Sequence, residues 1–386
     1  MTVRRSLLAL ALFTLPHASI AADQGVTDRA VTFAQIAALE GPAAALGTGM
    51  RQGIMAAFEE ANRKGGVHGR LLALESFDDG YEPDRSIEHV RAVINGDAHL
   101  GLIGPVGTPT TKATQPLTSE ARFPMIGPFT GAGFLRDAAH GNIFNVRATY
   151  AAETEAWIKY LVDEQGMQNI AILYQDDGFG RVGLTGVTEA LDRRGMRLVA
   201  EGTYTRNTVA VKKALLEIRK AKPDAVVMVG AYKPIAEFVK LSRKLKFDPT
   251  FVNISFVGSR ALADELGDQG EGVIVSQVVP FPWDDSLPVV AEYQAALAAL
   301  DAGLEPGFVT LEGYLVGRLA IAALQAAGPE LSREGYMAAL AGLRTLDLGG
   351  VAMQFGGGDN QGLDAVFLTR IEADGTFKPV AGAGNS

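Results

Sequence analysis

Short apolar, β-branched runs alternate with longer amphipathic segments along most of this 386-residue chain. This alternation is typical of successive β-α-β units, in which parallel strands form one sheet and helices cover both of its faces. The series begins near residue 31, restarts after about residue 148, and so predicts two doubly wound, Rossmann-like α/β lobes. The predicted helices span 46–64, 83–97, 110–121, 131–139, 151–166, 180–195, 208–221 and 233–246.

The remainder of the chain is mostly helical, with helices predicted at 287–302, 308–327 and 332–342 and a final β-hairpin that turns at Asp374-Gly375. These elements are too few for a third domain, so we expect them to complete the first two lobes. The chain then crosses between lobes three times, near 148, 280 and 349. The N-terminal lobe comprises 23–148 plus 281–349, the C-terminal lobe comprises 149–280 plus 350–386, and a three-strand hinge joins them around a ligand cleft.

The first 22 residues have the pattern of a secretion signal. A basic start that contains Arg4 and Arg5 is followed by an apolar run and by small residues up to Ala22. A membrane anchor needs about 20 apolar residues, and Pro16 interrupts this run too early. We therefore expect cleavage and export to the periplasm.

Composition narrows the function. The chain has no cysteine, so no disulfide, lipidated cysteine or thiolate metal site is available to it. Loss of the signal segment changes the formal net charge from −9 to −11. This acidic balance opposes nucleic-acid binding, which depends on Lys and Arg neutralising phosphates.

One motif suggests a dinucleotide-binding enzyme. Gly178, Gly180 and Gly183 form a G-x-G-x-x-G after an apolar strand. However, Asp176 and Asp177 stand between strand and glycine, where two carboxylates would repel a pyrophosphate. We interpret the glycines as a tight turn that lets Phe179 project from the end of the strand.

No other pattern selects catalysis. The five histidines form no H-E-x-x-H, and there is no G-x-S-x-G. We therefore expect no enzymatic activity, no cofactor and no metal.

Several segments together resemble the periplasmic solute-binding proteins of ABC transporters, of the branched-chain amino acid (Leu/Ile/Val) type. The resemblance implies the type I periplasmic-binding fold, with ligand bound between hinged lobes. It covers nearly the whole mature chain. The segments are "LEGPAAALGTGMRQGIMAAFEEANRKGGVHGR", "FDDGYEPDRSIEHVRAVI", "LIGPVGTPTTKATQP", "FPMIGPFTGAGFLR", "LYQDDGFGRVGLTG" and "GDQGEGVIV".

Carried over position by position, the resemblance implies a set of residues around the cleft. Thr108, followed by Pro109, is expected to cap a helix whose N-terminus favours an anionic ligand group. Thr130 either caps the next helix or touches the ligand. Phe129 and Phe179 either line the pocket or pack inside a lobe. The implied ligand-binding residues are Leu46, Thr108, Phe129, Thr130, Gly131, Phe179, Ala231 with neighbouring Tyr232, and Ser255.

Three departures from the family pattern bear on the ligand. Ser255 stands where amino-acid binders of this type place an acid that meets the ligand's ammonium group. Gly131 replaces a threonine that helps to hold the carboxylate, and Leu46 and Phe179 stand where tyrosines are common. Because a buried ammonium without a counter-charge is costly, these departures favour an apolar-bodied organic acid over an ordinary α-amino acid. Tyr81 and Gly107 occupy positions where relatives carry a disulfide.

The expected function is therefore that of a monomeric transport receptor that closes on a small solute and delivers it to an ABC transporter permease in the inner membrane. The alternative is a periplasmic sensor that works with a separate signalling partner. The two differ in which membrane protein recognises the closed form.

Overall fold

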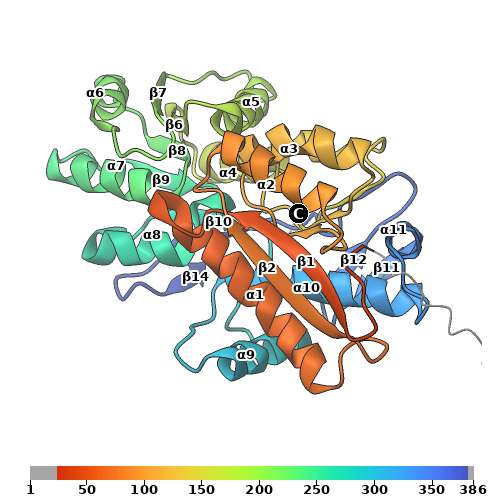
Figure 1. Cartoon of the computed structure of the whole chain (residues 1–386). Coiled ribbons are helices and arrows are strands. Elements are labelled where there is room, and N and C mark those ends of the chain that lie inside the picture. Colours follow the sequence, from red (N-terminus) through yellow and green to blue (C-terminus); the bar gives the residue numbers. More distant parts are fainter. Residues whose placement is uncertain (1–23, 381–386) are drawn as a thin grey trace, which may run out of the picture.

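The computed structural model describes residues 24–380, so the predicted signal segment, residues 1–22, lies outside the described residues. Two sheets, each flanked by helices, form the two lobes (Figure 1). This arrangement confirms the predicted α/β architecture.

The N-terminal sheet has five parallel strands in the order β2-β1-β3-β4-β5. Its strands are β1 Ala30–Ala37, β2 Leu71–Asp78, β3 Leu102–Ile103, β4 Met125–Ile126 and β5 Ile143–Phe144. The helices of this lobe are α1 Ala44–Arg63, α2 Pro83–Asn95, α3 Thr108–Glu120, α9 Pro288–Leu300, α10 Phe308–Ala327 and α11 Arg333–Gly342.

Alternation along β1 explains why helices cover both faces of this sheet. Val31 and Phe33 belong to the core shared with α1 and α10, whereas Ala34 and Ile36 belong to a separate buried cluster with Val90 of α2. Neighbouring residues of a strand point to opposite faces, so a run that is apolar throughout must be buried on both sides.

The C-terminal sheet has seven strands in the order β14-β13-β10-β9-β8-β6-β7. Its strands are β6 Ile170–Gln175, β7 Ala200–Tyr204, β8 Ala225–Val229, β9 Thr250–Asn253, β10 Ile274–Gln277, β13 Phe367–Ile371 and β14 Phe377–Pro379. Its helices are α4 Tyr150–Ile158, α5 Gly178–Asp192, α6 Lys212–Lys220, α7 Tyr232–Lys244 and α8 Ser259–Leu266. β13 and β14 form the predicted antiparallel hairpin, and β13 also pairs antiparallel with β10.

The third hinge crossing is predicted at 349, and the hydrogen bonds of the following segment bear on its position. After β11 Thr345–Asp347 and β12 Ala352–Gln354, the chain still bonds to the N-terminal lobe: the amides of Gly362 and Leu363 donate to the carbonyls of Asn145 and Val146. The chain enters the C-terminal sheet only at β13. Ala148, Val278 and Val366 pack together in one small buried cluster. We propose that the three crossings lie at these residues, which moves the third one about 17 residues along the chain.

Two further helix predictions need correction. The segment predicted as a helix at 131–139 is only a 3-10 turn, Gly133–Arg136. Helix α8 was not predicted at all. Helix α4 agrees with the predicted 151–166, but it passes into a π-helical turn at Lys159–Glu164.

Within the described residues, α10 is the one helix whose length and composition would suit a membrane span. Most of its residues are buried against α1, as expected for the central helix of a lobe. Its apolar character is therefore explained by packing.

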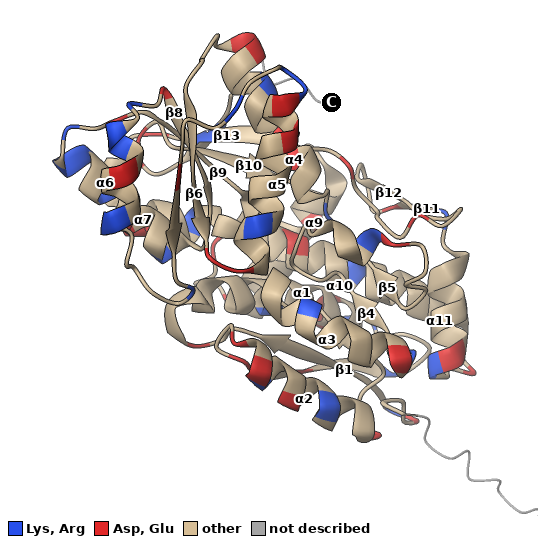
Figure 2. Ribbon diagram, turned by 90° about the horizontal axis from the view of Figure 1, so that it is seen from above, with Lys and Arg blue, Asp and Glu red and all other residues tan. Residues whose placement is uncertain are grey.

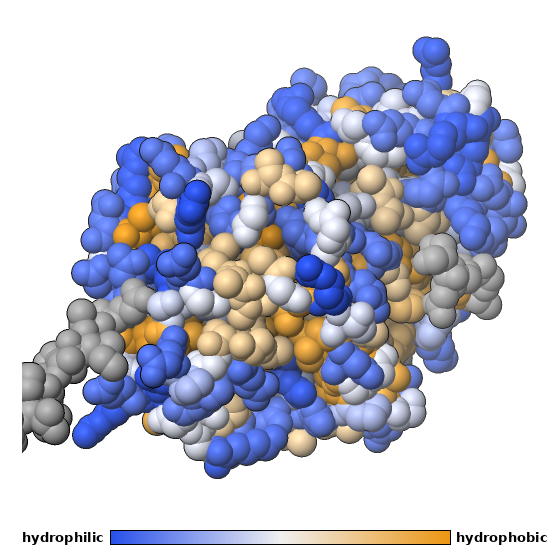
Figure 3. Space-filling model, turned by 90° about the vertical axis from the view of Figure 1, so that its right-hand side faces the viewer, coloured by the Kyte–Doolittle hydropathy of each residue, from blue (hydrophilic) through white to orange (hydrophobic). Residues whose placement is uncertain are grey.

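Charges of both signs are interspersed on the outer helices. Helix α2, for example, carries Asp84, Arg85, Glu88 and Arg91 (Figure 2). The face in Figure 3 is hydrophilic towards its two ends, and apolar side chains gather towards its middle.

Candidate functional site: the cleft between the lobes

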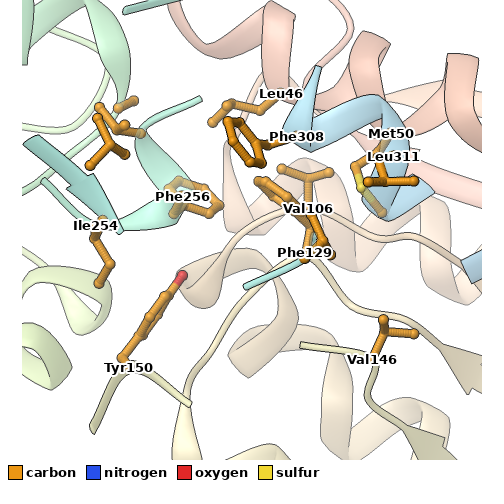
Figure 4. Close-up of a cluster of buried hydrophobic side chains, with 14 of the residues drawn as sticks. Leu46, Met50, Val106, Phe129, Val146, Tyr150, Ile254, Phe256, Phe308 and Leu311 are labelled. Carbon is orange, nitrogen blue, oxygen red and sulfur yellow. The ribbon is translucent and has the colours of Figure 1, made fainter. Parts of the chain in front are cut away.

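The interface between the lobes is centred on Phe256, in the 3-10 turn Ser255–Val257 of the C-terminal lobe. Its ring centroid lies 4.7 Å from that of Phe179 in the same lobe. Across the interface it lies 5.4 Å from Phe129 and 5.9 Å from Tyr81. All four side chains are buried. The lobes are thus closed on each other through an aromatic cluster (Figure 4).

Thr108 and Thr130 meet on the N-terminal side of this cluster. Their hydroxyl oxygens are 2.7 Å apart, and Thr130 Oγ1 also accepts from the amide of Ala132. The predicted cap is shifted by one residue: Gly107 is the N-cap of α3, and Thr108 is its first residue. The Thr108 hydroxyl is therefore not used to cap α3 and bonds to Thr130 instead.

Gly131 lets Tyr150 approach the same region. A Cβ at Gly131 would lie 2.6 Å from Cδ1 of Tyr150 and 2.7 Å from its amide nitrogen. The Tyr150 ring packs 5.5 Å from Phe179, and its hydroxyl points towards the aromatic cluster (Figure 4). Burial raises the pKa of Tyr150, and nearby Arg147 opposes that rise. The hydroxyl lies near Thr130 and Thr108 but has no partner in hydrogen-bond geometry within residues 24–380.

A buried ion pair lies behind Phe129, in the N-terminal lobe. Nε and Nη2 of Arg147 each donate to a carboxylate oxygen of Glu312 on α10, both at 2.8 Å. The guanidinium also lies 4.2 Å from the centre of the Phe129 ring. Burial alone would lower the pKa of Arg147. The charge of Glu312 outweighs that effect, so the pKa of Arg147 is raised. Nη1 of Arg147 is buried without a partner in the described part of the chain.

A second buried arginine orders the loop that carries Thr130. Arg136 donates from Nη1 to the carbonyls of Thr130 and Ala132, and from Nη2 to the carbonyl of Arg147. Burial, reinforced by nearby Arg147, lowers the pKa of Arg136 to about 9. These bonds hold the segment around the 3-10 turn in place, and the Ala132 carbonyl accepts the Leu135 amide as well as the Arg136 side chain.

Ser255 meets a carboxylate from another element. Glu153, in the first turn of α4, accepts the Ser255 amide at 2.8 Å and the Ser255 hydroxyl at 2.9 Å. Ser276 of β10 also donates to Glu153. Burial raises the pKa of Glu153, whereas Arg147 and these hydrogen bonds oppose the rise. An acid thus lies directly behind the position where the family pattern has one.

Leu46 and Tyr232 contact the opposite lobe at one end of the interface. The Tyr232 hydroxyl, at the start of α7, accepts the amide of Ala45 at 3.3 Å. Gly258, with φ +79°, passes so close to Leu46 that a Cβ at residue 258 would lie 2.6 Å from Cδ2 of Leu46. A side chain at 258 would be strained by this positive φ and would force Leu46 to move.

The glycine-rich segment forms the start of helix α5. Asp177 is the N-cap and accepts the amide of Phe179, and Asp176 pairs with Arg181. The glycines have helical backbone, so the predicted tight turn is wrong. Gly180 and Gly183 permit close packing, because Cβ atoms there would lie 1.9 Å from the Gln175 carbonyl oxygen and 2.5 Å from Val229. The segment nonetheless brings Phe179 to the cluster.

Polar contacts join the lobes at the other end. Arg206 of the C-terminal lobe binds Glu82 of the N-terminal lobe at 2.8 Å, and Asn207 donates to the Gly80 carbonyl at 3.0 Å. Tyr81 fills the space beside Gly107, where a Cβ would lie 2.2 Å from its ring. The two positions at which relatives carry a disulfide are therefore neighbours, and they are joined here by packing.

A hollow of about 440 Å³ lies between the lobes beside Leu46. It is bounded by the first turns of α1, by α8 and by the loop before α10, and residues 303–310 form its outer wall. Leu46 and Phe308 line it and lie side by side (Figure 4).

The structure brings eight of the nine sequence-derived residues to the interface region, and the ninth, Ala231, is the N-cap of α7 beside Tyr232. It also adds four residues that sequence reasoning missed. Tyr150, Glu153 and Phe256 surround Phe179 and Ser255, and Arg147 lies behind Phe129. Of these four residues, Phe256 was the easiest to predict from the sequence, because it directly follows Ser255 in the same turn. Glu153 looked like an ordinary acid in the first turn of a helix, where acids are common.

Two doubly wound lobes that close over a shared cleft define the class of two-lobed solute-binding proteins. The chain belongs to the periplasmic binding protein family, whose model matches residues 30–376. Among curated relatives, the leucine-specific-binding protein of Salmonella typhimurium is 21% identical over 71% of this chain and 74% of its own. The Leu/Ile/Val-binding protein BraC3 of Rhizobium johnstonii is 27% identical over 53% of this chain and 55% of its own.

Solved structures agree with the fold. A protein of Rhodopirellula baltica SH 1, described as a possible leucine/isoleucine/valine-binding protein, is 36% identical, with a TM-score of 0.87 over 94% of this chain and 98% of its own. A fatty acid ABC transporter substrate-binding protein from Thermomonospora curvata is 21% identical, with a TM-score of 0.85 over 94% of each chain. The latter likeness concerns the fold alone.

Proposed function

We propose that this protein is the periplasmic receptor of an ABC transporter and that it closes on a small, apolar-bodied organic acid. The observation that carries this proposal is the composition of the interface. Aromatic side chains of both lobes meet at Phe256, and the hydroxyl pair of Thr108 and Thr130 lies beside the N-terminus of α3. Rings suit an apolar body, whereas hydroxyls and a helix N-terminus suit a carboxylate.

Closure follows from contacts to both lobes. A ligand shifts an open–closed equilibrium only to the extent that it binds the closed state better. Thr108 and Thr130 belong to one lobe, and Phe179 and Ser255 to the other, so a ligand that touches both sets stabilises the closed form. The closed form is then the one that a membrane permease recognises.

Isothermal calorimetry with 4-methylpentanoate, phenylacetate, leucine and phenylalanine tests the proposal. We expect the wild type to bind at least one of the two acids more tightly than the amino acid of similar body. Preference for the amino acid in both pairs would overturn the proposed ligand class.

Phe179→Ala tests the location of the site. Loss of a ring that packs against Phe256 and Tyr150 should weaken acid binding ~10-fold or more, because about 1.4 kcal/mol of contact corresponds to tenfold in affinity. Phe238→Ala is the matched control, since Phe238 packs on Phe251 inside the C-terminal lobe. Unchanged affinity in a folded Phe179→Ala variant would remove Phe179 from the site.

A further inference from the structure

The Glu153 carboxylate is fully buried and takes three hydrogen bonds. The Ser255 amide and the Ser276 hydroxyl donate to Oε2, and the Ser255 hydroxyl donates to Oε1. A carboxylate has about four acceptor positions, so three are in use. Two of these three bonds come from Ser255, and one acceptor position, on Oε1, is left open.

This arrangement decides what Ser255 can offer a ligand. A serine hydroxyl has a single proton and two lone pairs. The proton is held by Glu153 Oε1, and the Ser255 amide proton is held by Oε2. What Ser255 has left for a ligand is the lone pairs of its oxygen, so it acts as a hydrogen-bond acceptor.

Other buried groups of the interface region, by contrast, have hydrogen-bond donors that are not used. Arg147 Nη1 is buried without a partner among the described residues, and Tyr150 Oη lies beside Thr130 and Thr108 without a bond in hydrogen-bond geometry. Thr108 and Thr130 have two hydroxyl protons between them, and only one is used in their mutual bond. Tyr150 and Glu153 lie three residues apart on α4, a spacing that puts both on one face of the helix. The helix that holds Ser255 through Glu153 therefore also carries the Tyr150 hydroxyl, beside Thr108 and Thr130.

Building on the proposed function, we propose that the ligand is a 2-hydroxy acid, whose carboxylate meets these donors while its hydroxyl donates to Ser255 Oγ. Glu153 is the positioning residue that fixes Ser255 as the acceptor. A hydroxyl needs one acceptor, which Ser255 supplies. An ammonium group carries three N–H donors and a full charge, whereas three of the four acceptor positions of Glu153 are already bonded to serine donors, so Glu153 offers it one position at most.

Calorimetry with three probes of equal carbon skeleton tests this inference: 2-hydroxy-4-methylpentanoate, 4-methylpentanoate and leucine. The wild type should bind the hydroxy acid ~10-fold or more tightly than the deoxy acid, as one hydrogen bond implies. In Glu153→Gln the amide can donate to Ser255 Oγ and release the serine proton, which the ligand hydroxyl can then accept. The ratio of the two affinities should therefore fall, but by less than in Ser255→Ala. Ser255→Ala should lower the same ratio by removing the acceptor.

Glu155→Gln is the matched control, because Glu155 lies on the same helix but pairs with Arg194 at the surface. It should keep the wild-type ratio. If circular dichroism shows that Glu153→Gln does not fold, the ratio of affinities for the hydroxy and deoxy acids in Ser255→Ala tests the inference instead.

Equal affinity of the wild type for the hydroxy and deoxy acids would overturn the inference and leave the proposed acid-binding function intact. Tighter binding of leucine than of the hydroxy acid would overturn it as well. Absence of binding to either acid, with leucine bound, would overturn the proposed function itself.

Discussion

Glu312→Gln is expected to lower the free energy of unfolding by about 3–5 kcal/mol, because it leaves the Arg147 guanidinium buried without its counter-charge. Both side chains are almost fully buried, and the pair has two hydrogen bonds of 2.8 Å. Nearby Glu153 has no hydrogen bond to Arg147, so its charge replaces the lost carboxylate only in part. Urea unfolding, followed by circular dichroism, measures the loss.

Glu292→Gln is the matched control for that experiment. Glu292 also pairs with an arginine, Arg318, but its side chain is half exposed, and such surface pairs contribute about 0–1 kcal/mol. A double variant, Arg147→Met with Glu312→Leu, should recover most of the stability, because replacing both partners leaves no buried charge unpaired. A loss below 1 kcal/mol in Glu312→Gln would show that the buried pair does not hold this region together.

Phe256→Ala is expected to have the second-largest effect, and that effect should fall on closure. The ring contacts Phe129 and Tyr81 of the opposite lobe as well as Phe179 of its own. Truncation of a buried phenylalanine lowers the free energy of unfolding by about 3–5 kcal/mol. Here part of the lost contact forms only in the closed state, so the truncation also makes closure less favourable. Acid binding should therefore weaken by ~100-fold, which corresponds to about 2.7 kcal/mol of lost closure energy.

Phe251→Ala separates closure from general loss of packing. Phe251 is buried in β9 and pairs with Phe238 within the C-terminal lobe. It should lower the urea midpoint as Phe256→Ala does, but leave ligand affinity within about threefold of wild type. Equal loss of affinity in the two variants would contradict a special role of Phe256 in joining the lobes.

The fold was largely predictable because its signals are local. Strands buried on both faces read as continuous apolar runs, and amphipathic helices repeat at 3.6 residues, so the β-α-β series could be followed along the chain. The exceptions involve side-chain and long-range bonds. The segment around Arg136 has helix-like spacing but forms only a 3-10 turn, which side-chain bonds of Arg136 to two carbonyls hold in place. The path after residue 349 depends on bonds to Asn145 and Val146, which lie some 200 residues away in sequence.

The candidate site was only half predictable. The resemblance pointed to positions around the cleft, but it could not show that Glu153 reaches Ser255 from a separate helix. Position 255 is a serine and not an acid, but a carboxylate, that of Glu153, nevertheless lies next to it. Such pairings depend on how α4 packs against the turn at 255–257. Because the paired residues are about 100 residues apart in the chain, no local sequence pattern predicts them.

Small-angle X-ray scattering of the wild type, without ligand and with a saturating acid that calorimetry has shown to bind, tests the central claim most directly. The claim is that two hinged lobes close on a ligand held between them. It predicts a smaller radius of gyration with ligand, and a smaller change in Phe256→Ala at matched saturation. Superimposable curves for the free and saturated wild type would contradict it.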